Sequence, residues 1–201
     1  MANGEKTPAI HAAVKRWLLI LLLSGHSAML LAAPSISVHT RYYPVYGADS
    51  PAILKSILQN GPVGKDGKRY HAYTQWDIRW GYRWVETRKR CQLASTSVSV
   101  EIEYLLPELK TTTFREKDYR KKWDRYFNAL LRHEQQHKDL GVQAAREIDA
   151  KLAQAEDQPG CAQLKNRLDA IAEQVIEKYA DKERAFDRET AHGARQGVAL
   201  P

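Results

Sequence analysis

The segment from His133 to His137 reads His-Glu-Gln-Gln-His, with two histidines four positions apart and a glutamate directly after the first. On a helix, residues four apart share one face with their Cβ atoms about 5–6 Å apart, so two imidazole nitrogens can reach one zinc ion. Glu134 is rotated about 100° from His133, so it can stand beside the metal as a general base. The spacing therefore predicts a zinc site with its own water-activating base. The competing interpretation is two solvated histidines on an ordinary helix.

A catalytic zinc ion usually has three protein ligands and one open position. We predict His192 as the third ligand, because it follows the second of two predicted helices, and an antiparallel helix pair would return it towards the first. The neighbouring Gly193 permits a close backbone approach. The remaining histidines of the exported chain, His39 and His71, fall among strand residues and are interpreted as surface histidines. The alternative third ligand is a glutamate of the second helix, at Glu173, Glu177 or Glu183.

A metal-bound histidine normally gives its second ring nitrogen to a carboxylate or a carbonyl group. Acidic residues lie near the candidate ligands in the sequence, at Asp139, Asp187 and Glu189. A solvated charge is the commoner role for any one of them, so we do not include them in the site.

Two long helices must position these residues. An apolar stripe at helical spacing runs from Trp123 to Leu131, leads into the motif and continues to Leu152. The segment Asp-Gln-Pro-Gly at 157–160 ends this helix, and a second stripe follows from Leu164 to Tyr179. The tail from Phe186 onward shows no periodicity, so no regular structure is expected there.

Before the helices, the segment 36–46 is expected to form a strand, and alternating apolar residues predict two more strands at 70–85 and 98–104. Pro44 suggests an edge strand, and Pro107 is expected to end the last strand. On the second strand the tryptophans at 76, 80 and 84 share one face, which we interpret as core. A short helix is expected before residue 61, with Ser50 as its N-cap. The order predicts an α+β fold, with a small antiparallel sheet packed on two long C-terminal helices.

The N-terminus predicts an export signal. Lys15 and Arg16 precede an apolar run, and Ala32 and Ala33 offer small residues for cleavage. The expected organisation is a signal peptide at 1–33 followed by a single domain at 34–201. The alternative is an uncleaved N-terminal anchor; the interruption at 24–27 leaves the run short for a stable membrane span.

Composition narrows the function classes further. With 43% hydrophobic residues among 201, disorder is not expected. The signal carries three of the 31 basic and one of the 24 acidic residues, so 28 and 23 remain, a net charge of +5. An exported chain of this charge is not expected to bind nucleic acid. Its two cysteines, Cys91 and Cys161, predict one disulfide, with free thiols or a metal-bound pair as alternatives.

Three segments together resemble the bacterial DUF922 family, which is described as predicted secreted zinc-dependent proteases. They are HEQQH at 133–137 after an aromatic-rich helix, GKRYHAYTQWDIRWGYRW at 67–84, and FDRETAHGARQG at 186–197. The resemblance covers about Tyr42 to Gly197. It implies zinc ligands at His133 and His137, a general base at Glu134, a third ligand at His192 and a zincin-like fold.

We therefore expect an exported, periplasmic or secreted, zinc-dependent metallopeptidase that acts on a peptide or protein substrate. Zn²⁺ is the expected cofactor, and Glu134 is the expected base. The alternative is a non-catalytic envelope protein that uses zinc for structure or binds a partner. The sequence does not predict the oligomeric state or the substrate.

Overall fold

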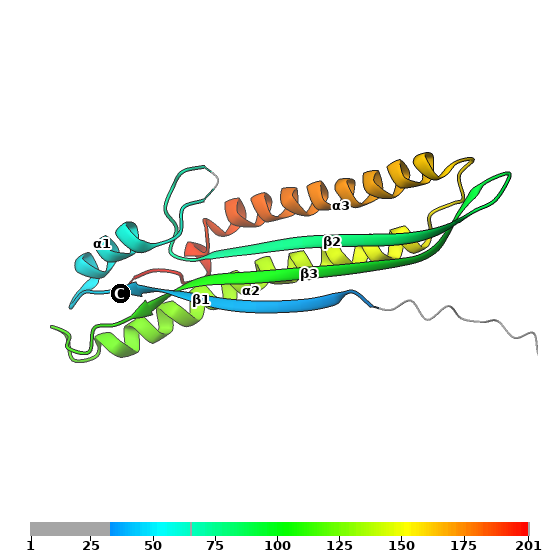
Figure 1. Cartoon of the computed structure of the whole chain (residues 1–201). Coiled ribbons are helices and arrows are strands. Elements are labelled where there is room, and N and C mark those ends of the chain that lie inside the picture. Colours follow the sequence, from blue (N-terminus) through cyan, green and yellow to red (C-terminus); the bar gives the residue numbers. More distant parts are fainter. Residues whose placement is uncertain (1–32, 65, 201) are drawn as a thin grey trace, which may run out of the picture. The chain divides into compact units, whose positions relative to one another are not determined.

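The computed structural model describes residues 33–64 and 66–200 of the chain. The predicted export signal lies outside this part, apart from its last residue, Ala33. The elements follow in the order β1 (Ser35–Val45), α1 (Ser50–Asn60), β2 (Tyr73–Glu86), β3 (Cys91–Leu109), α2 (Tyr119–Ala153), α3 (Cys161–Thr190) and the 3₁₀ turn η1 (Ala194–Gln196) (Figure 1). None of the helices in the described residues has the length and apolar character needed to cross a membrane.

The three strands form one mixed sheet in the order β1-β3-β2. Strands β2 and β3 are antiparallel, as a short connection between strands requires. Strand β1 instead pairs with β3 in parallel, which corrects the expectation of a purely antiparallel sheet. The connection from β1 to β2 spans 46–72 and contains α1, so it is long enough to place β1 on the far edge of β3.

The alternation predicted along β2 is confirmed over most of its length. Thr74 and Ile78 are buried, and Trp76 and Trp80 pack half-buried against the core between sheet and helices. Trp84 is 39% exposed and follows a shift in strand register after Arg83, so its assignment to the core was wrong.

Two predicted boundaries also need correction. Strand β3 continues through Pro107 to Leu109, beyond Leu105, the last residue that pairs with β2. Proline is tolerated there because that side of the strand has no ladder to complete. Helix α1 is capped by Asp49, whose carboxylate accepts a hydrogen bond from the N–H of Ala52 at 3.1 Å, and not by Ser50.

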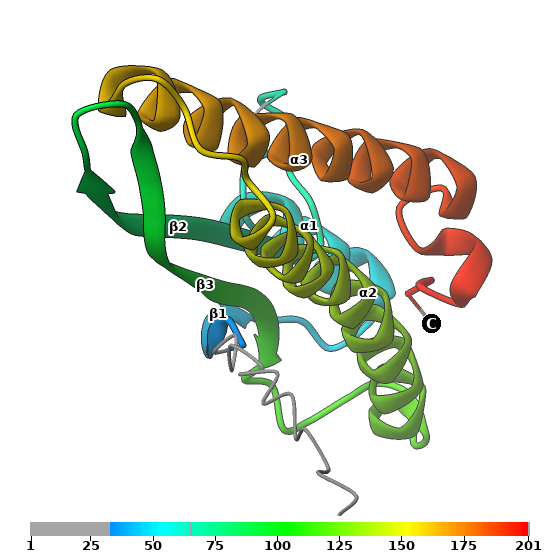
Figure 2. The ribbon, with the colours of Figure 1, turned by 90° about the vertical axis from the view of Figure 1, so that its right-hand side faces the viewer.

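Helices α2 and α3 run antiparallel and cover the same face of the sheet (Figures 1 and 2). One core cluster joins both helices to the sheet through residues that include Ile102, Ile148 and Leu168, each fully buried. A second cluster joins the start of α2 to α1 and to the ends of β1 and β3. Helix α3 extends to Thr190, so part of the tail expected to lack structure is helical.

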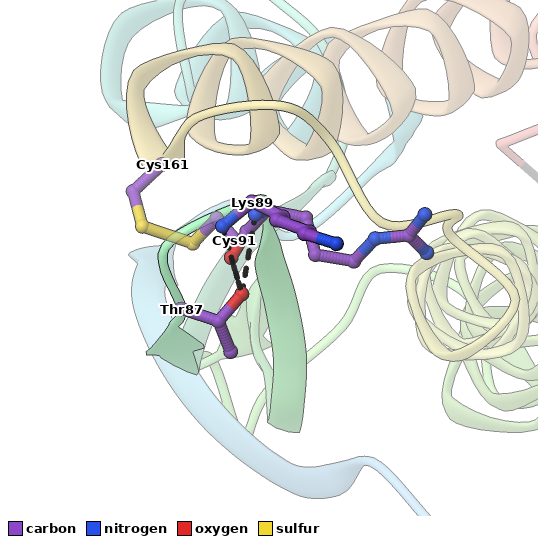
Figure 3. The surroundings of a disulfide bond; sticks show 5 residues. Thr87, Lys89, Cys91 and Cys161 are labelled. Carbon is purple, nitrogen blue, oxygen red and sulfur yellow. Dashed lines mark hydrogen bonds between the residues drawn. A yellow bond between two sulfur atoms is a disulfide. The ribbon is translucent and has the colours of Figure 1, made fainter.

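The predicted disulfide is confirmed between Cys91 and Cys161, with their Cα atoms 5.0 Å apart. It joins the first residue of β3 to the first residue of α3 (Figure 3). The backbone N–H groups of Cys91 and Gln158 each donate to the other residue's carbonyl, at 2.8 and 3.1 Å. Together these bonds fasten the start of α3 to the sheet.

Candidate metal centre

The motif lies on α2, on the face that points into the protein. His133, Glu134 and His137 are only 4%, 5% and 8% exposed. The Nε2 atoms of the two histidines lie 3.4 Å apart, with the two rings nearly perpendicular. Solvated histidines on a helix surface do not have this arrangement, so that interpretation is wrong for the part of the chain described here.

A third side chain converges on the same point from α3. Asp187 places its Oδ1 atom 3.3 Å from Nε2 of His133 and 3.1 Å from Nε2 of His137. These are the three residues among those described whose ligand atoms form a group able to hold a metal ion. The sequence interpretation took Asp187 for a solvated charge. A signal was present, because Asp187 and Glu183 continue the buried stripe of α3 at intervals of four from Tyr179.

The geometry of the three atoms fits a small tetrahedral ion. Ligand atoms about 2.0–2.1 Å from a tetrahedral zinc ion are separated from one another by about 3.4 Å. The three separations observed are 3.1, 3.3 and 3.4 Å. Two imidazole nitrogens and one carboxylate oxygen also make a ligand set typical of zinc and related divalent metals.

The remaining ring nitrogens of both histidines face hydrogen-bond acceptors. Nδ1 of His133 lies 2.9 Å from Oε1 of Gln196, and Nδ1 of His137 lies 3.3 Å from Oε1 of Glu183. The indole N–H of Trp76 donates to the same Glu183 oxygen at 2.7 Å and fixes its position. If a metal ion displaced the Nε2 protons, these acceptors would hold the remaining ring protons on Nδ1, and each Nε2 would offer its lone pair to the metal.

Two candidates for the third ligand, Glu183 and His192, both lie near the group but outside it. Glu183 stands behind the His137 ring, where it can orient the ligand but does not join the converging atoms. His192 lies at the rim, 55% exposed in its side chain, with Nδ1 3.6 Å from Oδ1 of Asp187. The structure thus does not bring His192 into the group of three, and its role as a ligand stays a prediction.

The chain turns sharply after α3 and packs its tail on His133. Ala191, His192 and Gly193 have φ values of 50°, 50° and 82°, a left-handed run that reverses the chain. A Cβ atom on Gly193 would lie 2.6 Å from Cγ2 of Val198 and 3.1 Å from Cγ of His133. The close approach expected of Gly193 is therefore real, and it brings Gln196 to His133.

Glu134 lines the same cavity as the three converging residues and is held by the sheet. The hydroxyl of Thr74 on β2 donates to Oε2 of Glu134 at 2.5 Å. Burial raises the pKa of Glu134, while the Thr74 hydrogen bond and the nearby histidines act in the opposite direction. The sequence pattern of β2 gives no indication that Thr74 supports the motif, because a threonine on an apolar strand face is ordinary.

The charges of the group support one another. Burial opposes the charged form of His137, but hydrogen bonds to Asp187 and Glu183 raise its pKa to about 10. Burial likewise acts to raise the pKa of Asp187, but hydrogen bonds from His133 and His137 hold it well below its ordinary range. Asp187 is thus ionised near neutral pH and offers a charged oxygen to a cation.

The group lies in a cavity of about 790 Å³ that has walls from four parts of the chain. These are the segment before and at the start of β2, helix α2, the end of α3 and the tail after it. His71 lines this cavity and is only partly exposed, so its interpretation as a surface histidine was wrong. His39 does lie on the surface, with its side chain 60% exposed.

Fold and site together define an α+β domain with a buried two-histidine, one-aspartate group that could hold a metal ion. The chain belongs to the family described as "Bacterial protein of unknown function (DUF922)", whose model matches residues 40–193. This match confirms the family resemblance. No curated protein and no solved structure matches the chain.

Proposed function

We propose that this protein is an exported zinc-dependent metallopeptidase whose metal is held by His133, His137 and Asp187. The observation that carries the proposal is the convergence of two Nε2 atoms and one carboxylate oxygen, 3.1–3.4 Å apart, beside a buried glutamate. Three protein ligands and an adjoining cavity are typical of catalytic zinc sites, whereas structural zinc sites are closed by four ligands. His192 is the alternative third ligand.

When bound, zinc supplies Lewis-acid chemistry, because it polarises a carbonyl group and lowers the pKa of water. The protein's own residues do the remaining work. Glu134 takes a proton from the attacking water and delivers it to the leaving amine. The Thr74 hydroxyl holds the Glu134 carboxylate in one orientation, and burial moves the pKa of this base upward towards the working pH.

Gln196 and Glu183 keep the protons of the two histidines on Nδ1, which preserves the ligand lone pairs. Asp187 contributes a negative charge that favours the cation. Helix α2, which carries the His-Glu-x-x-His motif, packs against strand β3 of the sheet. This arrangement supports the proposed zincin-like fold. The predicted signal at 1–33 supports export to the periplasm or beyond.

The decisive variant is Glu134→Gln, which keeps the shape of the side chain and removes the base. We expect it to fold, to retain zinc and to lose hydrolysis of an unfolded protein such as casein. Wild-type hydrolysis that survives in Glu134→Gln would show that this glutamate is not the base. A zinc-loaded wild type without hydrolysis of any peptide would favour the alternative, an envelope protein with a structural metal.

A further inference from the structure

His71 is held from two sides by buried tyrosines. The hydroxyl of Tyr43 donates to the backbone carbonyl of His71 at 2.6 Å. The hydroxyl of Tyr126 lies 2.9 Å from Nδ1 of the His71 ring. Both tyrosines are almost fully buried, at 6% and 1% exposure, so main chain and ring of His71 are fixed together.

The buried Tyr126 hydroxyl decides which ring nitrogen of His71 carries the proton. Burial raises the pKa of Tyr126 far above its ordinary value, so the phenol keeps its hydrogen. Within the described part of the chain, Nδ1 of His71 is the one acceptor within reach of this hydrogen. If Nδ1 carried a proton instead, the phenol hydrogen would be buried without an acceptor, which costs about 1–3 kcal/mol. Tyr126 therefore donates to Nδ1, and the ring proton sits on Nε2.

The Nε2 atom of His71 opens onto the cavity. No buried side-chain nitrogen or oxygen among the described residues lacks a hydrogen-bond partner. Nε2 has no partner among them, so it is not a buried atom, and His71 lines the cavity that contains Glu134 and the metal-binding group. Burial also lowers the pKa of His71, which keeps the ring neutral at pH 7. The cavity thus contains a fixed, uncharged N–H donor on the wall before β2.

We propose that His71 binds the substrate by donating its Nε2 hydrogen to a peptide carbonyl oxygen. This inference rests on the proposed peptidase function and adds a substrate-binding residue to it. A neutral N–H group offers a hydrogen bond but no charge, which suits an uncharged carbonyl oxygen better than a carboxylate. The alignment of Tyr126, Leu130, His133 and His137 along one face of α2 ties this donor to the helix that carries the metal ligands.

A matched pair of substitutions separates the two nitrogens of the ring. In His71→Asn, the side-chain oxygen can still accept from Tyr126, but the donor towards the cavity is gone. In His71→Gln, the amide nitrogen reaches the place of Nε2 and keeps a donor. We expect His71→Asn to raise KM for casein about three- to tenfold with kcat unchanged, as for one lost neutral hydrogen bond. We expect His71→Gln to raise KM less than His71→Asn, because it keeps the donor towards the cavity although the Tyr126 hydroxyl loses its acceptor, with zinc content equal in all three proteins.

The ring proton can be located without any activity, by nitrogen-15 NMR of the histidine rings at pH 7. The expected result is a neutral His71 protonated at Nε2, which becomes a mixture of both forms in Tyr126→Phe. A charged ring, or a proton on Nδ1, overturns the proposal, as do equal KM values in His71→Asn and wild type. Absence of zinc or hydrolysis in the wild type would instead refute the peptidase function, and the NMR result would still decide whether His71 is a donor.

Discussion

Zinc must displace a proton from His137, and this competition makes metal binding depend on pH. Hydrogen bonds to Asp187 and Glu183 outweigh the effect of burial and raise the pKa of His137 to about 10. In metal-free protein this ring is therefore charged throughout the neutral range. Binding releases its proton, so the apparent zinc affinity rises as the pH rises towards 10.

The magnitude follows from one proton per zinc ion. Between pH 7.5 and 8.5, the apparent affinity should rise about tenfold, or about 1.4 kcal/mol. A histidine with the ordinary pKa of about 6.5 would change it by only about 10% over the same interval. The stability of the metal-free protein changes with pH in the opposite direction from the zinc affinity. Because the pKa of His137 is raised in the folded state, its charged form stabilises the fold fully below pH 6.5, and this contribution is lost as the pH rises through 10.

Competition with a chelator of known pH dependence measures the affinity, and NMR of the metal-free protein assigns the proton to His137. We expect its ring to titrate near pH 10 and near a lower pH in Glu183→Gln, which replaces one of the two carboxylate acceptors with an uncharged amide oxygen. Titration of His137 near its ordinary value of 6.5 in the wild type would refute the proposed network of charges.

Three further outcomes follow from the contacts around the site. Replacing both Cys91 and Cys161 with alanine should lower the unfolding free energy by about 4 kcal/mol in urea titrations, because the disulfide closes a loop with a sequence separation of 70; a loss below about 1 kcal/mol would contradict this. Thr74→Val leaves the ionised Glu134 without its hydrogen-bond donor, so it should lower the unfolding free energy at pH 8 by about 1.5–3 kcal/mol. It should also move the acid limb of the pH–rate profile to higher pH, while Thr74→Ser, which keeps the hydroxyl, should do neither. Gly193→Ala should weaken zinc binding about 10–100-fold, because the added Cβ atom would lie 3.1 Å from Cγ of His133 and displace this ligand. The control is Gly197→Ala, which also has a positive φ but places its Cβ atom 3.8 Å from that of Ala129, and it should leave the zinc affinity unchanged.

The sequence predicts much of this fold because its apolar residues recur at helical or strand spacing over long segments. The stripes on α2 and α3, the alternation on β2 and the motif on a helix all report which face of an element is buried. The parallel pairing of β1 with β3 could not be predicted in the same way. The alternation of a strand shows its buried face but not its partner, and β1 is exposed along residues 35–42.

In the candidate site, too, the residues that are close in sequence could be predicted, and those from distant elements could not. His133, Glu134 and His137 belong to one helical turn, so local spacing places them together. Asp187 and Thr74 reach the motif from elements far away in the sequence, and side chains of their types are usually solvated or unremarkable on a strand. The buried stripe of α3 continues from Tyr179 through Glu183 to Asp187, and two acids on such a stripe are the feature that indicates a buried polar site.

The metal content of four proteins tests the proposed site most directly. The wild type without a histidine tag, His137→Ala, Asp187→Ala and His192→Ala would each be incubated with zinc, dialysed and measured by mass spectrometry, with circular dichroism to confirm folding. We expect about one zinc ion per chain in the wild type and in His192→Ala, from the three ligands that a catalytic site needs, and loss of zinc in the other two. Zinc kept in Asp187→Ala but lost in His192→Ala would move the third ligand to His192, and a wild type without zinc would contradict the metal centre itself.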